Sequence, residues 1–273
     1  MLKFSANLSF LYPELPFLDR FGAAARDGFR AVEYVSPYEV PAEEIAAKLQ
    51  SHGLTQALFN LPAGDWAAGE RGIGCHADRT PDFQTGIGTA IRYAKALGCT
   101  KLNCLSGIAP AGSSVEGRDA VLIANLKYAA PRLADAGIKL LLEPINLRDI
   151  PGFHVTTTHH AERLLDAVGS DNLYIQFDVY HAQVMQGDLV PTYARLRERI
   201  AHIQIADNPG RNEPGTGEIN YGFVLSEIER LGYDGWVGCE YKPKAGTTDG
   251  LGWMKSYREA RQNDHPISVN YRS

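Results

Sequence analysis

Four oxygen-bearing side chains end apolar runs in the second half of the chain, each about one strand–helix unit from the next. They are Glu143, Asp178, Gln204 and Glu240. If the runs are parallel strands of one sheet, their carboxyl ends lie on the same side and bring these side chains together. Three carboxylates and an amide in one place repel each other unless a cation lies among them. Oxygen ligands suit a hard divalent ion, Mg²⁺ or Mn²⁺, better than a structural zinc.

Any one of these side chains alone is more often a helix cap or a solvated loop residue than a ligand. Four such side chains at matching positions on neighbouring strands favour a functional site. Gln204 is the weakest member, because an amide is a poor ligand and can instead orient a neighbour. His202 and Gln176 precede Gln204 and Asp178 by two residues, so each points to the same face one layer lower. We interpret both as hydrogen-bonded core residues.

Three further side chains are candidates for contacting a substrate. His181 follows Asp178 by three residues, on the turn into the next helix. Arg211 lies in a loop rich in Gly and Pro, residues 206–218, and can hold a substrate oxygen or carboxylate. A surface pair with Glu213 is the alternative for Arg211. Arg71 lies in the loop 60–72. This loop can close over the site, with Trp66 excluding water. The alternative is that the loop is a flexible excursion of the chain.

The adjacent pair His159-His160 is not expected to bind a metal. Neighbouring residues on a helix point about 100° apart, since a turn takes 3.6 residues, and rarely share one ion. We expect both side chains on the surface of a helix, near its start.

The elements that must position these residues alternate along the chain between short apolar runs and amphipathic stretches. Strands are predicted at 2–7, 31–35, 54–59, 101–105, 138–143, 173–178, 200–206 and 236–240. Helices are predicted at 15–27, 41–51, 83–97, 115–136, 157–168, 181–198, 221–231 and within 250–262. The helix at 181–198 is expected to break in two at Gly187 and Pro191.

Eight such units predict an α/β fold, a single (β/α)8 barrel over residues 1–262, followed by a polar tail at 263–273. An open, doubly wound sheet is the alternative. It is disfavoured because no Gly-x-Gly-x-x-Gly turn follows the first strand.

Composition excludes several classes of protein. The chain has 273 residues, of which 44% are hydrophobic and 22% charged, and a formal net charge of −5. An acidic balance is poorly suited to nucleic acid or to an anionic membrane. The apolar runs are far shorter than the roughly 20 residues of a membrane-spanning helix, and the first residues do not resemble a secretory signal. Four cysteines without a Cys-x-x-Cys pair indicate reduced thiols and a cytoplasmic protein.

Four segments carry a family resemblance that covers nearly the whole chain. They are 59–72, 142–153 (Leu-Glu-Pro-Ile-Asn-Leu-Arg-Asp-Ile-Pro-Gly-Phe), 177–181 (Phe-Asp-Val-Tyr-His) and 202–221. In these the chain resembles the hydroxypyruvate isomerase family, which includes 2-oxo-tetronate isomerases, among the xylose isomerase-like TIM barrels. Residues 152–155 depart from the more apolar pattern of that family.

The resemblance implies a divalent metal, Mg²⁺ or Mn²⁺, held by Glu143, Asp178, Gln204 and Glu240, with Glu143 and Glu240 as the catalytic pair. It implies that His181 and Arg211 contact substrate oxygens. Arg71 and Arg211 both remain candidates for the substrate carboxylate.

The implied reaction is the isomerisation of a small hydroxy-oxo acid by proton transfer through an enediolate. Hydroxypyruvate would become tartronate semialdehyde, or 2-oxo-tetronate would become 3-oxo-tetronate. Related ketose epimerases usually have His where Gln204 stands, which favours the isomerase branch.

Rival functions belong to other classes. A ketose 3-epimerase would use the same barrel and metal on free sugars. A metal-dependent endonuclease would need several histidines around its metals and a basic surface, and a non-catalytic binding protein would leave the four side chains in register unexplained. The sequence carries no interface signature, so homo-oligomerisation stays open.

Overall fold

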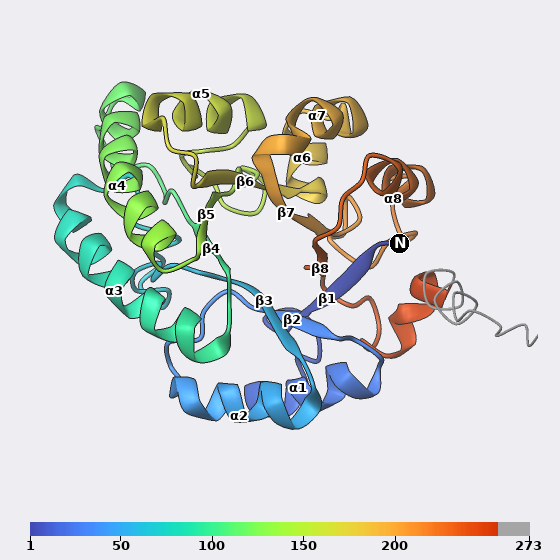
Figure 1. Ribbon diagram of the computed structural model, residues 1–273. Coiled ribbons are helices and arrows are strands. Elements are labelled where there is room, and N and C mark those ends of the chain that lie inside the picture. The colour runs from blue at the N-terminus through green and yellow to red at the C-terminus, as the bar shows by residue number, and fades with distance from the viewer. Residues whose placement is uncertain (256–273) are drawn as a thin grey trace, which may run out of the picture.

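The computed structural model describes residues 1–255, which form a closed barrel of eight parallel strands in chain order, β1 to β8 (Figure 1). The strands are β1 (Lys3–Asn7), β2 (Ala31–Glu33), β3 (Thr55–Asn60), β4 (Lys101–Cys104), β5 (Lys139–Leu142), β6 (Leu173–Asp178), β7 (Ile200–Ile205) and β8 (Trp236–Cys239). β8 pairs with β1 and closes the sheet. The predicted (β/α)8 barrel is confirmed, and the open sheet is wrong. The predicted boundary between residues 262 and 263 lies outside the described residues.

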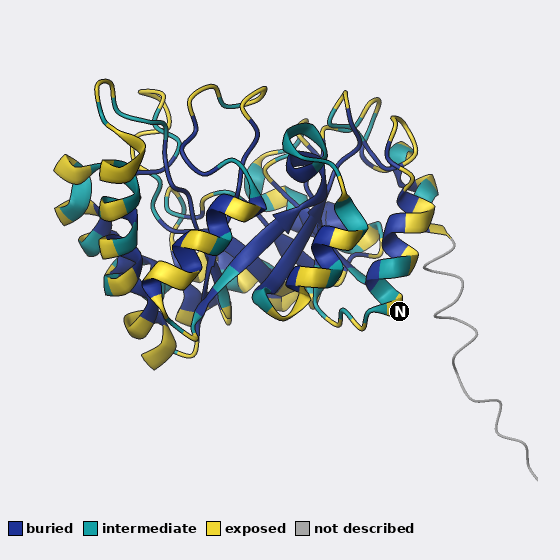
Figure 2. Cartoon of the chain, turned by 90° about the horizontal axis from the view of Figure 1, so that it is seen from above, coloured by how far each residue is buried: buried dark blue, intermediate teal, exposed yellow. Residues whose placement is uncertain are grey.

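Helices surround the barrel and leave the strands buried. They are α1 (Phe17–Arg26), α2 (Ala42–His52), α3 (Thr80–Leu97), α4 (Val115–Asp135), α5 (Thr158–Val168), α6 (Val179–Met185), α7 (Leu189–Leu196) and α8 (Tyr221–Arg230). Short 3₁₀ turns are η1 (Ala77–Arg79), η2 (Arg197–Arg199) and η3 (Asp249–Met254). Figure 2 shows buried strands inside helices whose outer faces are exposed. Among residues 1–255 no helix is long and apolar enough to cross a membrane.

Two predicted helices differ from the structure. The segment 181–198 does divide, but at Gly187 and Asp188, whereas Pro191 lies in the first turn of α7. A proline costs little there, because the first N–H groups of a helix have no partner within the helix. The last predicted helix, within 250–262, is a 3₁₀ turn as far as Met254, and its remainder from residue 256 onward lies outside the described residues.

The alternation of side chains along each strand sorts the core into two layers. Outward residues such as Leu140 and Ile203 belong to the large apolar cluster beneath the helices. Inside the barrel, Leu58, Leu141 and Ala201 form a small apolar cluster of their own. The inward positions beyond that cluster, toward the carboxyl ends of the strands, are polar. They include Ser5, Asn7, Glu33, Asn103, Gln176, Asp178, His202 and Gln204, all buried.

Gly238 in β8 lets one of these polar side chains fit. A Cβ built on Gly238 would overlap the carboxylate of Glu33, which four side chains hold in place by hydrogen bonds. We therefore predict that Gly238→Ala lowers the free energy of unfolding by about 1–3 kcal/mol, the usual cost of overpacking. Urea denaturation measures this change.

Gly88→Ala is the matched control. Gly88 is exposed on α3 and a Cβ there meets nothing within 4 Å, so this variant should gain up to about 1 kcal/mol from helix propensity. Equal effects of the two substitutions would contradict the packing of Glu33 against β8.

Candidate active site

Four acidic and imidazole side chains converge at the carboxyl ends of β5, β6 and β8. Glu143 directly follows β5, Asp178 ends β6, His181 lies in the first turn of α6 and Glu240 directly follows β8. One ligand atom from each lies within 4.8 Å of those of the other three, and all four residues are buried. The structure thus brings together these four of the seven site residues predicted from the sequence, and Gln204 and Arg211 contact Glu240 beside them.

Asp178 caps α6 with one carboxylate oxygen and leaves the other oxygen without a hydrogen-bond partner. Its Oδ1 accepts the backbone N–H of His181 at 3.0 Å and caps α6. Its Oδ2 is buried and has no hydrogen-bond partner. An unpartnered buried carboxylate oxygen is costly, so this atom is one that a cation would satisfy.

The orientation of His181 is set by Asn146. The Asn146 side-chain amide lies 2.6 Å from Nδ1 of His181, and the backbone N–H of Asn146 also donates to that nitrogen. With donors on Nδ1, the proton of the neutral ring is assigned to Nε2. Nε2 lies 3.8 Å from Glu143 Oε1 and 3.9 Å from Asp178 Oδ2. Burial lowers the pKa of His181 well below its usual range, and Arg211 lowers it further. The ring is therefore a neutral donor that faces the cavity.

Amide groups hold the two glutamates. Glu143 Oε2 accepts from the side-chain amide of Asn103 at 2.9 Å. Glu240 Oε2 accepts from Asn7 at 2.8 Å and from Gln204 at 2.7 Å. Neutral amide donors thus hold the Oε2 atom of each glutamate.

Gln204 uses both of its side-chain N–H groups in hydrogen bonds. Its Nε2 donates to Glu240 and, at 2.8 Å, to Glu33, and its Oε1 accepts from Gln176 at 2.7 Å. His202 Nε2 donates to the Glu33 carboxylate at 2.9 Å, and Gln176 donates to Gln204. The interpretation of His202 and Gln176 as hydrogen-bonded core residues is confirmed. The role of Gln204 as a metal ligand stays a prediction.

Sequence reasoning missed a deeper carboxylate and two amides. Glu33 is fully buried below Glu240, where it binds Ser5, Asn7, His202 and Gln204. Glu33, Asn7 and Asn103 all stand at or near the ends of strands in the first half of the chain. The rule that found the acidic residues of the second half, a polar residue ending an apolar run, fits Asn7 alone. Glu33 and Asn103 stand inside the predicted runs 31–35 and 101–105, so the signal would have been a polar residue within an apolar run.

Arg211 supplies a positive charge at the cavity. Its guanidinium donates to Glu240 Oε1 at 2.6 Å and to Asp149 at 2.8 Å, and lies 4.8 Å from the ring centroid of Phe10. Its Nε is buried without a partner. The alternative surface pair with Glu213 is wrong, since Glu213 instead accepts the backbone N–H of Lys244.

Arg71 lies elsewhere, in the loop after β3. It donates to the backbone oxygens of Trp66 and Glu70, and its guanidinium stacks 4.1 Å from the ring centroid of Trp66. Within residues 1–255 no hydrogen bond or ion pair joins Arg71 to the carboxylates of the site. Its predicted contact with a substrate carboxylate therefore stays a prediction, while its observed contact is with the tryptophan that faces the cavity.

The charges of the site are unbalanced. Burial raises the pKa of Glu143 well above its usual range, and Glu240 and Asp178 raise it further. Burial also raises the pKa of Glu240 to about 8, against the opposing effect of Arg211. Burial raises the pKa of Asp178 as well. Crowded buried carboxylates of this kind fit a divalent cation, whose charge would favour their ionised forms.

These side chains line a small inner cavity of about 100 Å³. Its wall includes Glu143, His181, Gln204, Arg211 and Glu240, and on the apolar side Phe10, Val35 and Trp66. A ligand in this cavity would meet two carboxylates, an imidazole donor and a guanidinium at once.

A second cluster lies outside this cavity and corrects one expectation. His160 is not on the surface: it is 9% exposed, and its Nε2 lies 2.7 Å from Asp119 Oδ1. His154 Nε2 lies 2.8 Å from the same oxygen. His160 thus lies with Asp119 of α4 and with His154 of the loop before α5, and not with its neighbour His159, whose side chain is 70% exposed as expected.

The chain matches known proteins over most of its length. The family model described as xylose isomerase-like TIM barrel matches residues 21–257. A hydroxypyruvate isomerase of Escherichia coli is 55% identical over 94% of this chain and 100% of its own length. A 2-oxo-tetronate isomerase of Cupriavidus necator is 48% identical over 94% of this chain and 99% of its own.

Solved structures agree with the barrel. One described as AP endonuclease, family 2, from Brucella melitensis has a TM-score of 0.92 and 44% identity, covering 94% of this chain and 99% of its own. A D-allulose 3-epimerase from Methylomonas sp., at a TM-score of 0.76 and 19% identity, covers 95% of this chain and 97% of its own, and shows the fold alone.

The fold and the curated relatives together define a barrel enzyme of the isomerase class. The chain belongs to the xylose isomerase-like TIM barrel family, on the branch of the hydroxypyruvate and 2-oxo-tetronate isomerases.

The second cluster generates a prediction about stability. Arg118 donates to His154 Nδ1, so the proton of neutral His154 is on Nε2 and faces Asp119. Burial, together with the neighbouring His160 and Arg118, lowers the pKa of His154 to about 4 against the opposing effect of Asp119. As pH falls from about 6.5 toward 4, the unfolded chain binds a proton that the folded chain does not. Stability should therefore fall over this window, by at most about 1.4 kcal/mol per pH unit for one proton.

Urea denaturation between pH 4 and pH 7 measures this contribution. His154→Gln should flatten the dependence of unfolding free energy on pH, whereas His159→Gln, at an exposed position, should leave it as in the parent protein. The same slope in both variants would refute a neutral His154.

Proposed function

We propose that this protein is a metal-dependent isomerase of small 2-oxo hydroxy acids. It would interconvert hydroxypyruvate and tartronate semialdehyde, or 2-oxo-tetronate and 3-oxo-tetronate. The observation that carries the proposal is the pair of buried glutamates, Glu143 and Glu240, that face one small cavity with His181 and Arg211. The two curated relatives that act on such acids, at 55% and 48% identity, favour this reaction over that of a ketose 3-epimerase.

The residues present fit a divalent metal. Glu143, Asp178, Gln204 and Glu240 would hold Mg²⁺ or Mn²⁺, supported by the unpartnered Asp178 Oδ2 and by the raised pKa values of all three carboxyls. When bound, the cation would stabilise negative charge on the substrate oxygens and acidify the neighbouring C–H.

Glu143 is the better placed of the two glutamates to take a proton. Its Oε2 is held by Asn103, while its Oε1 faces the cavity near His181. In the forward reaction Glu143 would accept the proton from C3 of hydroxypyruvate, and the electrons of that C–H bond would move into an enediolate. Glu240, carrying a proton taken from solvent, would deliver it to C2. The hydroxyl proton on C3 would pass to the oxygen on C2 as the aldehyde forms, and Glu143 would release its proton to solvent.

His181 and Arg211 would bind the substrate. The Nε2–H of His181 is a neutral donor suited to a hydroxyl or carbonyl oxygen. Arg211 would pair with the substrate carboxylate, since its guanidinium is fixed at the cavity wall by Asp149 and Glu240. A cytoplasmic location is part of the proposal and is supported by four buried cysteines that form no disulfide.

Proton NMR in D₂O tests the reaction directly. Chelator-stripped protein would be mixed with hydroxypyruvate, with and without added Mg²⁺ or Mn²⁺. We expect metal-dependent tartronate semialdehyde that carries deuterium at the new C–H. Product without deuterium would refute exchange of the proton with solvent, and no turnover of either the three-carbon or the four-carbon acid would refute the function.

Glu143→Gln and Glu240→Gln should each lower kcat by at least about 100-fold, because each removes an acid–base group and keeps its shape. Steady-state turnover of hydroxypyruvate measures the loss. Glu43→Gln, on the exposed face of α2, is the control and should leave kcat unchanged. Near-normal turnover in either site variant would remove that glutamate from the proton transfer.

Arg211→Lys should raise KM for hydroxypyruvate by about tenfold or more, because a lysine cannot reproduce the paired donors that Asp149, Glu240 and a carboxylate require. Arg71→Lys, which alters only the support of Trp66, should change KM less than threefold by the same assay. A larger rise in KM for Arg71→Lys than for Arg211→Lys would instead assign the substrate carboxylate to Arg71.

A further inference from the structure

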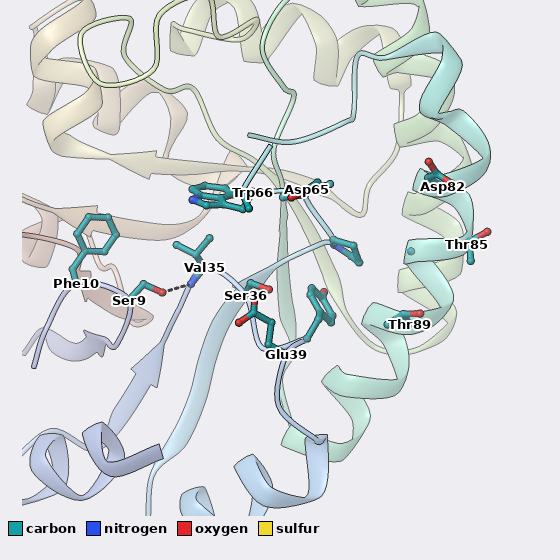
Figure 3. A pocket seen from close by; sticks show the side chains of 16 residues that line it. Ser9, Phe10, Val35, Ser36, Glu39, Asp65, Trp66, Asp82, Thr85 and Thr89 are labelled. Carbon is teal, nitrogen blue, oxygen red and sulfur yellow. Dashed lines mark hydrogen bonds between the residues drawn. The ribbon is translucent and has the colours of Figure 1, made fainter. Parts of the chain in front are cut away.

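A larger outer cavity of about 860 Å³ lies beside the inner one, between the loops after β1, β2 and β3 and the helix α3 (Figure 3). Phe10 and Trp66 stand on one side of it, and Thr85 and Thr89 of α3 stand on the other. Sites for small molecules usually measure about 300–1,000 Å³. The outer cavity has that size, whereas the inner cavity of about 100 Å³ does not.

The two cavities share a wall. Phe10, Val35 and Trp66 line both of them. Phe10 also packs under the guanidinium of Arg211, which lines the inner cavity. A molecule whose carboxylate lies at Arg211 would therefore pass between Phe10 and Trp66 as it extends into the outer cavity.

The side chains that line the outer cavity favour one chemical class of ligand. Its charged side chains are all acidic, namely Glu39, Asp65 and Asp82, and no Lys or Arg is among the described residues that line it. Asp82 is paired with Arg79, and Asp65 accepts the backbone N–H of Ala68. A second anionic group would be repelled here, so the end of a ligand that enters this cavity is not acidic.

Hydroxyl groups and an aromatic face complete the lining. Ser9, Ser36, Thr85 and Thr89 line the outer cavity with hydroxyl groups. Thr85 donates to the Pro81 carbonyl oxygen and keeps its acceptor capacity, whereas Ser9 accepts from the Val35 N–H and keeps its donor. Trp66 is 45% exposed, and Arg71 stacks on its ring. An indole face beside hydroxyl and carboxylate acceptors suits a chain of carbons that each carry a hydroxyl group.

We propose that the outer cavity is a binding site for the neutral, hydroxylated tail of five- and six-carbon sugar acids. The acid end and the reacting carbons would lie in the inner cavity, and the carbons beyond them would lie along Trp66 toward α3. This assignment of the reacting end rests on the proposed function, whereas the binding of the tail is testable by itself.

Isothermal titration with aldonic acids of three to six carbons tests the tail site. These acids lack the oxo group, so they bind without being isomerised. In buffer with Mg²⁺, we expect the six-carbon acid to bind at least tenfold more tightly than the three-carbon acid. Thr85→Trp should abolish this gain, because the new indole fills the cavity from its far wall.

Ala96→Trp is the matched control, since it places the same side chain on an exposed position of α3 that does not line the cavity. It should keep the full gain in affinity with chain length. Equal affinities from three to six carbons, or a gain that survives Thr85→Trp, would overturn the proposal. A diamine is the probe for a cationic ligand. If it binds and the affinity of the acids does not rise with chain length, the proposal is overturned and the acidic lining is assigned to a cation.

Turnover of hydroxypyruvate in the same variants separates this inference from the proposed function. Thr85→Trp should leave kcat/KM for the three-carbon acid within about twofold of the parent value. Turnover of hydroxypyruvate without any gain in binding for longer acids would refute the tail site alone. A gain in binding without turnover of any oxo acid would refute the isomerase and leave the tail site standing.

Discussion

The constraint on which the structure depends is the burial of four carboxylates within one end of the barrel. Glu33, Glu143, Asp178 and Glu240 are all buried there, and Arg211 is the guanidinium that pairs with one of them. Such a concentration of like charge opposes folding unless donors or cations compensate it. Amides from the strands provide the donors, and the unpartnered oxygen of Asp178 marks where they do not suffice.

The barrel satisfies this constraint by dividing its interior into layers. Leu58, Leu141 and Ala201 fill the lower interior with apolar contacts. Glu33 lies above them with its carboxylate completely engaged, so it holds Gln204 in place, and Gln204 in turn holds Glu240. The upper carboxylates are thereby positioned from below, while their remaining oxygens face the cavity. The strands hold the side chains rigidly, and the residues at the strand ends face the inner cavity.

Much of this arrangement was accessible from the sequence because it follows from periodicity. Alternating apolar runs and amphipathic stretches predicted the closed barrel, and the residues that end the runs predicted the convergence of Glu143, Asp178 and Glu240. What sequence could not give depends on contacts between elements distant along the chain. The pairing of His160 with Asp119 joins α5 to α4, and the direction of Arg211 depends on Asp149, so neither can be read from local spacing.

The central claim is that the crowded carboxylates form one divalent cation site. Titration of chelator-treated protein with Mn²⁺, followed by calorimetry and by the thermal midpoint, tests it most directly. The account predicts one ion per chain, a rise in the midpoint with Mn²⁺ concentration, and a loss of both in Asp178→Asn, which keeps a cap for α6 but removes the charged ligand. Failure of the parent protein to bind Mn²⁺ or Mg²⁺, or unchanged binding by Asp178→Asn, would contradict it.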